Sequence, residues 1–182
     1  MEVNRLVRSG VVVVVAAGNT GYGTLATDAL GARKGGLALT INDPGNAELA
    51  ITVGSTHRDM PHAYGVSYFS AKGPTGDGRL KPDLLAPGEK VVSCAAGSLL
   101  VRIVEKLPEG VLPPNYIEYT GTSMAAPHAS GCVAAFLSVK REFIGQPERV
   151  KEIFLKTATS LGRERSFEGY GLVDVMRAVQ FV

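Results

Sequence analysis

Continuous apolar runs, rather than strictly alternating ones, mark the strands that this sequence predicts. Residues 11–17 read VVVVVAA and residues 49–54 read LAITVG, and polar residues do not alternate with apolar ones in either run. A β-branched run of this kind is typical of a strand that is buried on both faces, as in the centre of a parallel sheet. Residues 84–86, which lie between prolines, and residues 91–93 are predicted as further short strands.

Apolar residues at helical spacing predict four helices. A short helix is expected over residues 2–9 and ends at Gly10. The longest helix is expected over residues 123–139, with Pro127 near its start, where a missing N–H costs least. Two more helices are expected, over residues 147–158 and from residue 169 to about 180. A buried parallel strand needs strand neighbours and helices on both faces, so an isolated chain that lacked them should associate or aggregate.

The segments between these elements predict loops. Residues 21–48 are rich in Gly and Asn and are expected to form loops around one short apolar piece, residues 37–41. Residues 42–46, NDPGN, are a turn whose side-chain oxygens could bind a cation, but no calcium-loop spacing is present, and a solvated turn is favoured. Residues 97–115 are expected to form a surface excursion with either a hairpin or a short helix, and residues 160–171 a polar turn.

Composition narrows the class of protein. The chain has 182 residues and is 45% hydrophobic, which fits one soluble globular domain with its own core. Its formal net charge of +2 gives no argument for nucleic acid or an anionic membrane as a partner. The chain has neither a run of eighteen apolar residues nor a signal peptide in MEVNRLVRSG, so the compartment stays open with a lean towards the cytoplasm. No cofactor is predicted, and calcium binding cannot be read from the sequence.

The cysteines and two of the histidines predict no metal site. Cys94 and Cys132 are expected to be free, buried thiols rather than a disulfide or metal ligands. His57 and His62 are five residues apart, which suits neither one helical face nor a zinc pattern. They are expected to be surface loop residues.

The string GTSMAAPHASG, residues 121–131, carries the strongest candidate chemistry. Thr122 or Ser123 can cap the following helix through its hydroxyl, and taken alone this favours a cap over a nucleophile. A hydroxyl at a helix start also lies among unpaired N–H groups, which would stabilise negative charge on an attacked carbonyl. Ala125 replaces the second glycine of a G-x-S-x-G nucleophile elbow, which argues against an α/β-hydrolase.

The whole eleven-residue string closely resembles the nucleophile segment of the subtilisin-like serine peptidases. By this resemblance Ser123 attacks the peptide carbonyl, and Gly121 and Thr122 belong to its loop. The string AAGNTG, residues 16–21, resembles the family's oxyanion-hole segment and implies that Asn19 donates to the tetrahedral intermediate. Alone, an Asn in such a loop is usually a turn residue. The resemblance also implies that one wall of the primary specificity pocket, with room for a sizeable apolar side chain, consists of Ala16, Ala17 and Gly18.

Further matches to the family follow in the same order and extend the resemblance from about Val11 to Val179. They are AITVG, F-S-x-x-G-P, K-P-D-x-x-A-P-G and G-x-G-x-V-D. The resemblance implies a three-layer α/β fold, with a mostly parallel sheet and helices on both faces. Residues 1–182 are then expected to be a partial peptidase domain, from the oxyanion-hole strand to the C-terminal helices, with the N-terminal portion missing.

Two segments of the family's pattern are missing. The family's Asp segment (D-T/S-G) and His segment (H-G-T-H) precede the oxyanion strand, but only ten residues precede Val11 and neither motif occurs. His128 follows Ser123 by five residues, about 140° around a helix and about 7.5 Å along it, so its imidazole is expected to point away. A serine without an adjacent base is a weak nucleophile. The chain is therefore expected to be inactive alone.

Three interpretations follow from these residues. The leading one is a serine endopeptidase acting on peptides or proteins, represented by a C-terminal fragment whose further partner is the missing N-terminal part of the domain. The second is a non-catalytic relic of the peptidase fold that binds peptides or a partner. The third is a truncated product with no function of its own. Neither nucleic acid nor a membrane is an expected partner.

Overall fold

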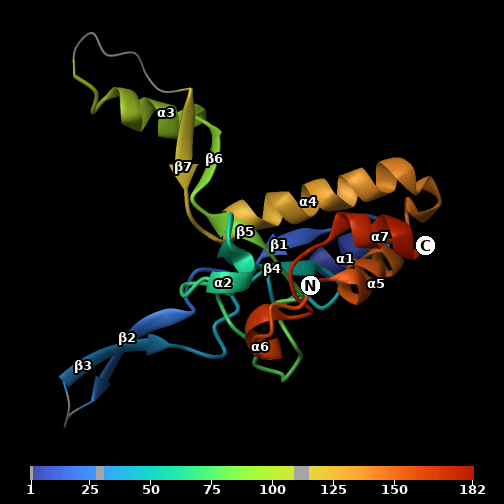
Figure 1. The fold of residues 1–182 in the computed structure, drawn as a ribbon, viewed down its shortest axis with the longest axis horizontal. Helices are drawn as coiled ribbons and strands as arrows, with labels where there is room; N and C mark the ends of the chain where they lie inside the picture. Colours follow the sequence, from blue (N-terminus) through green and yellow to red (C-terminus); the bar gives the residue numbers. More distant parts are fainter. Residues whose placement is uncertain (1, 28–30, 109–114) are drawn as a thin grey trace.

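A computed structural model describes residues 2–27, 31–108 and 115–182 of the chain. At its centre, β1 (Val14–Ala16), β4 (Ile51–His57) and β5 (Leu84–Glu89) form a parallel sheet in the order β1-β4-β5 (Figure 1). Val14 lies opposite Ile51, and Val53 lies opposite Leu84. Helices pack on this parallel sheet, so the predicted α/β fold is confirmed.

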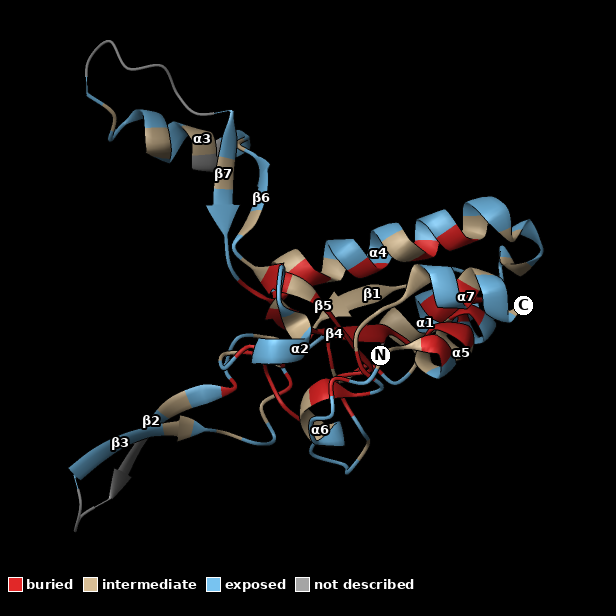
Figure 2. Cartoon of the chain, viewed as in Figure 1, coloured by how far each residue is buried: buried red, intermediate tan, exposed pale blue. Residues whose placement is uncertain are grey.

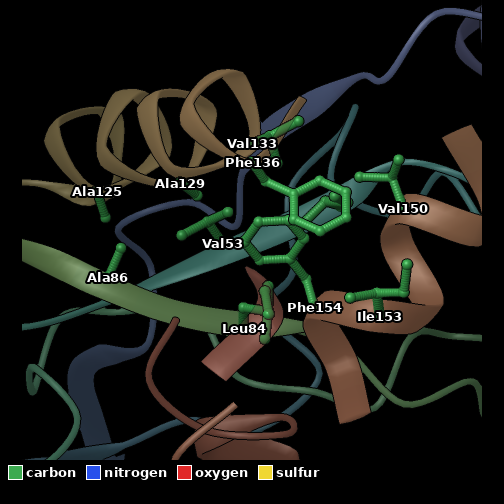
Figure 3. Close-up of a cluster of buried hydrophobic side chains, with 12 residues drawn as sticks. Val53, Leu84, Ala86, Ala125, Ala129, Val133, Phe136, Val150, Ile153 and Phe154 are labelled. Atoms are coloured by element: carbon green, nitrogen blue, oxygen red, sulfur yellow. The ribbon is translucent and has the colours of Figure 1, made fainter. Parts of the chain in front are cut away.

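One face of the sheet carries the hydrophobic core. Three helices supply its other side: α4 (Thr122–Val139), α5 (Pro147–Thr157) and α7 (Val175–Phe181). The rings of Phe136 and Phe154 meet edge-on with their centroids 5.6 Å apart, and both side chains are fully buried (Figure 3). Ala125 and Ala129 point from α4 towards the sheet, and their small side chains let the N-terminal half of α4 approach the strands closely (Figure 3). This close packing positions the start of α4.

Polar loops cover the opposite face of the sheet. In β4, alternate side chains point to this face, and their hydroxyls bond to loop carbonyls. Thr52 Oγ1 donates to the Gly45 carbonyl at 2.7 Å, and Thr56 Oγ1 donates to the Gly65 carbonyl at 2.5 Å. Between them, a Cβ added at Gly54 would lie 2.8 Å from Leu85 Cδ2 of β5 and 3.0 Å from Ser70 Oγ of the covering loop. The loops are therefore held tightly against β4.

A buried ionic cluster joins the entry of β5 to β4 and α5. Lys81 Nζ lies 2.5 Å from Asp83 Oδ2, and Lys151 Nζ lies 3.2 Å from the same oxygen. The Thr52 N–H also donates to Asp83 Oδ2, at 2.7 Å. Burial lowers the pKa of Lys81 to about 8, against the opposing attraction of Asp83. The Asp83 carboxylate thus has partners on three segments, which offset the cost of burying it.

Two arms project from this body (Figure 1). One is the antiparallel hairpin of β2 (Tyr22–Thr27) and β3 (Gly31–Gly36). The other contains the antiparallel pair β6 (Val91–Cys94) and β7 (Tyr116–Tyr119), with α3 (Gly97–Val104) between them. The described side chains of both arms are mostly exposed (Figure 2). The remaining elements are α1 (Glu2–Arg8), α2 (Pro61–Tyr64), the 3₁₀ turn η1 (Arg141–Phe143) and α6 (Arg165–Glu168).

Several sequence predictions are confirmed and others are wrong. The helices expected near residues 2–9, 123–139 and 147–158 are present, and the last helix is present but begins only at Val175. The prediction of loops over residues 21–48 is wrong, because β2 and β3 pair through their backbones without the apolar alternation that marks a half-buried strand. Residues 28–30 of that segment lie outside the described residues.

The burial expected for β1 is also wrong. Residues 12–16 are only half-buried because, within the described residues, β1 pairs with β4 along one edge alone. Cys94 is exposed on β6 and Cys132 is half-buried on α4, so the expectation of two buried thiols fails for Cys94; both cysteines are free. The excursion over residues 97–115 contains a short helix, α3, although residues 109–114 lie outside the description. Residues 160–171, expected to be a turn, contain the one-turn helix α6.

Candidate active site

Ser123 lies exposed in the first turn of α4, immediately after β7 and Gly121. The N-cap residue is Gly121, and no side-chain hydroxyl caps the helix, so the predicted cap by Thr122 or Ser123 is wrong. Thr122 is buried, and its Oγ1 accepts from the Gly18 N–H at 3.2 Å. The Thr122 hydroxyl is therefore bonded to the loop that follows β1, and the exposed hydroxyl at the helix start is that of Ser123. Backbone N–H groups at this helix start lack intrahelical partners.

Asn19 joins the end of β1 to the start of α4. Its Oδ1 accepts from the Thr122 N–H at 2.9 Å and from Thr122 Oγ1 at 3.0 Å. Two donors that converge on one atom identify it as the amide oxygen, and this leaves Nδ2 with two N–H groups. Nδ2 makes no hydrogen bond within the described part of the chain, and Asn19 is exposed. The two bonds from Thr122 thus fix the orientation of the Asn19 amide, and its Nδ2 keeps both N–H groups available beside Ser123.

Glycines allow this close approach. A Cβ at Gly121 would lie 3.3 Å from Asn19 Nδ2, which is tighter than most side-chain contacts. A Cβ at Gly18 would lie 2.6 Å from Asn42 Nδ2, and Gly18 has a φ of +109°, a conformation that disfavours other residues. The Gly121 N–H also donates to the Gly88 carbonyl at 2.8 Å, which ties the serine loop to the end of β5.

The imidazoles of the described chain are engaged elsewhere. His57 lies at the end of β4 rather than in a loop, and its Nδ1 accepts from the backbone N–H groups of Asp59 and Met60, both at 3.2 Å. His62 is exposed on α2. His128 Nδ1 lies 2.8 Å from the Met124 carbonyl, a contact within α4 that agrees with its predicted structural role. No imidazole in the described ranges hydrogen-bonds to Ser123.

A cavity of about 440 Å³ opens beside Ser123 and Asn19. Of the three residues predicted to form a wall of the specificity pocket, Ala16 and Gly18 line this cavity and Ala17 does not. Ala17 is fully buried and packs with Ile41 and Ala71, because successive strand residues point to opposite faces. A further side of this cavity comes from a turn that the sequence analysis did not assign to it: Asn42, Asp43 and Pro44. Its turn signal was visible, but its place beside Ser123 depends on the pairing of β1 with β4.

A second groove, of about 550 Å³, runs along α4 on the other side of Ser123. Its lining is largely apolar and includes Val91 and Val92 of β6 and Pro127 of α4. Cys132 lies in the same groove, where burial, and to a lesser extent the charge of Asp174, raises the pKa of its thiol. The thiol is therefore unsuited to act as a second nucleophile.

The described ranges contain neither a candidate metal site nor a helix suited to cross a membrane. No group of three His, Cys, Asp or Glu side chains in residues 2–27, 31–108 and 115–182 is arranged to hold a metal ion. Among the helices of those ranges, none has both the length and the apolar character needed to cross a membrane.

Known sequences are similar to this chain over most of its length. The sequence model of the Subtilase family matches residues 2–173. Serine protease AprX of Bacillus subtilis is 32% identical over 166 residues, which are 90% of this chain and 33% of AprX. Pyrolysin of Pyrococcus furiosus is 32% identical over 193 residues, covering 93% of this chain and 12% of that protein. The chain thus spans a third or less of each of these two relatives.

Solved structures agree in fold. The chain superimposes on the Prenylagaramide maturation protease PagA with a TM-score of 0.66 and 22% identity, covering 98% of this chain and 53% of PagA. The self-cleaved protease domain of PatA gives a TM-score of 0.64 and 24% identity, with 98% and 52% coverage. At these identities the structures show the fold alone. The match of the family model over most of the sequence shows that the chain belongs to the subtilase family.

Proposed function

We propose that this chain carries the nucleophile and the oxyanion hole of a serine endopeptidase. The observation that carries the proposal is the pair of hydrogen bonds from Thr122 to Asn19 Oδ1, at 2.9 and 3.0 Å. These bonds orient Nδ2 as a donor before any substrate arrives, and preorganised donors are what stabilise a developing oxyanion. Ser123, exposed at the start of α4, is placed for attack from the same site.

The reaction proposed for this site is acyl transfer. Ser123 Oγ attacks the peptide carbonyl carbon, and its proton passes to a general base. Asn19 Nδ2 and the Ser123 N–H donate to the resulting oxyanion. Collapse of the intermediate breaks the C–N bond, the protonated amine leaves, and water then hydrolyses the acyl ester of Ser123. Since no described imidazole hydrogen-bonds to Ser123, we assign the base to a histidine outside this chain, oriented by an aspartate.

Two apolar grooves along α4 support the proposal that a second polypeptide completes this site. The edge of β1 that pairs with no strand of the described residues lies beside an apolar groove of about 290 Å³, which Val12, Val14 and Leu137 help to line. The larger groove along α4 is also apolar and reaches Ser123 itself. A strand added to β1 and a helix laid along α4 would cover both surfaces and bring a base to the serine. The relatives' greater length agrees with such a missing portion.

Fluorophosphonate labelling tests this proposal. The 182-residue chain is compared alone and when co-expressed with a subtilase N-terminal segment that carries the D-T-G and H-G-T-H motifs. We expect labelling only in the complemented sample and its loss in Ser123→Ala. The matched control is Ser138→Ala, an exposed serine of the same helix that lines neither groove and whose Oγ donates to the Ala135 carbonyl, and it should label normally. Labelling that survives Ser123→Ala would refute the assignment of the nucleophile.

A second candidate function is peptide binding without cleavage. It is favoured by the absence of a described imidazole at Ser123, while the cavity and the groove beside that serine remain open. Peptide binding by the complemented protein without turnover or labelling would support this candidate over the peptidase.

A further inference from the structure

The cavity of about 440 Å³ beside Ser123 has one ionisable side chain in its lining, Asp43. Ser123 and Asp43 both line this cavity, so a substrate residue attacked by Ser123 can place its side chain towards Asp43. The small residues of the predicted wall favour an apolar occupant. The structure adds Asp43 and Asn42 from a turn that the sequence does not connect to this wall, and these side chains change the polarity of the site.

The Asp43 carboxylate has hydrogen-bond acceptor sites that the described residues do not fill. Its Oδ1 accepts from Asn46 Nδ2 at 3.3 Å, and it forms no ion pair with the described residues. An ionised carboxylate offers about four acceptor sites and is acceptor-only. The residue is exposed, and water therefore satisfies the remaining sites in the free protein.

A hydrogen bond to Thr20 holds the side chain of the neighbouring Asn42. Asn42 Oδ1 accepts from Thr20 Oγ1 at 3.0 Å, and its side chain packs over Gly18. Asn42 therefore forms part of the wall, and its uncharged amide leaves the charge of Asp43 uncompensated. The aliphatic part of the lining comes from Val15, Ala16 and Pro44.

These observations decide between an apolar and a cationic occupant. An apolar side chain would displace water from the Asp43 carboxylate without replacing its hydrogen bonds, which is costly. A Lys or Arg side chain has methylenes for the apolar wall and a charged donor for the carboxylate. We propose that Asp43 makes this pocket select Lys or Arg at the substrate residue whose carbonyl Ser123 attacks. This inference rests on the proposed function and deepens it by naming a substrate class.

The test compares arginine with citrulline, its uncharged isostere, in otherwise identical peptides cleaved by the complemented protein. We expect kcat/KM to be roughly ten- to a hundredfold higher for the arginine peptide, the range for one hydrogen bond to a charged group. Asp43→Asn should bring the two peptides within about threefold of each other, and Asp43→Lys should reverse the preference. The matched control is Asp59→Asn, which removes an exposed aspartate that pairs with Arg58 outside the cavity.

A binding measurement separates failure of this inference from failure of the proposed function. Nα-acetyl-arginine methylamide and its citrulline analogue are titrated into the same protein, and the amide signals of Gly18 and Asn19 are followed by NMR. An arginine preference that Asp43→Asn removes supports the inference even if no peptide is cleaved. Cleavage that is equal for both peptides, or a preference for Leu or Phe that Asp43→Asn leaves unchanged, overturns it while the peptidase stands. Absence of any arginine preference in binding and turnover also overturns it.

Discussion

Replacing Thr122 by valine tests whether its hydroxyl joins the oxyanion strand to the serine helix. The side chain is 1% exposed, and its Oγ1 accepts from the Gly18 N–H at 3.2 Å and donates to Asn19 Oδ1 at 3.0 Å. Valine keeps the volume but removes both bonds. A typical hydrogen bond contributes about 1 kcal/mol, and an unpaired buried donor costs about 1–3 kcal/mol. We therefore expect Thr122→Val to lower the free energy of unfolding by about 2–3 kcal/mol.

Thr122→Ser is the matched control, because it keeps the hydroxyl and removes one methyl group. Burial of one such group contributes about 0.8 kcal/mol, so the loss should be about 1 kcal/mol. Both variants are measured by urea unfolding of the complemented protein, with comparison of the midpoints at constant slope. Thr122→Val should also slow fluorophosphonate labelling, since Asn19 then has one anchor instead of two. If Thr122→Val is as stable as Thr122→Ser, the Thr122 hydroxyl does not join the two segments.

Three further predictions concern the same machinery. Asn19→Asp keeps Oδ1 but replaces the donor Nδ2 by an acceptor. Like Asn19→Ala, it should slow labelling by about a hundred- to a thousandfold, the range that loss of such a donor costs in a subtilisin. Equal labelling rates in the wild type and the variants would contradict the assignment of Asn19. Lys81 has a pKa of about 8 in the folded protein and an ordinary value of 10.5, so the unfolded state binds more protons between these two pH values. The free energy of unfolding that this group contributes should therefore rise from about pH 8 to 10.5, and the rise should be absent in Lys81→Met. Parallel pH profiles of unfolding for the two proteins would count against this prediction. Gly121→Ala brings a Cβ 3.3 Å from Asn19 Nδ2 and should reduce labelling. Gly76→Ala is its control, because Gly76 has open space around it and lines neither groove; it should label normally and gain about 0.4–1 kcal/mol of stability in the same urea assay.

Much of the body of the fold could be predicted from local patterns. The strands at β4 and β5 and the helices α4 and α5 followed from apolar runs and helical spacing, because these elements bury a continuous face in one core. The hairpin of β2 and β3 could not, since its strands are held by backbone pairing and carry no apolar alternation. The half-burial of β1 was missed for a related reason, because a run of valines does not reveal how many neighbours the strand has.

For the candidate site, local sequence predicts the residue types and their order: a serine at a helix start, an asparagine at a strand end, and small residues around them. It could not determine which atoms meet. Tertiary structure decided that the Thr122 hydroxyl bonds Asn19 and Gly18 rather than capping α4, that Ala17 faces the core, and that Asp43 lines the cavity beside Ser123. The physical reason is that these contacts form between segments brought together by the parallel sheet, where side-chain direction and hydrogen-bond competition are set by packing and not by local sequence.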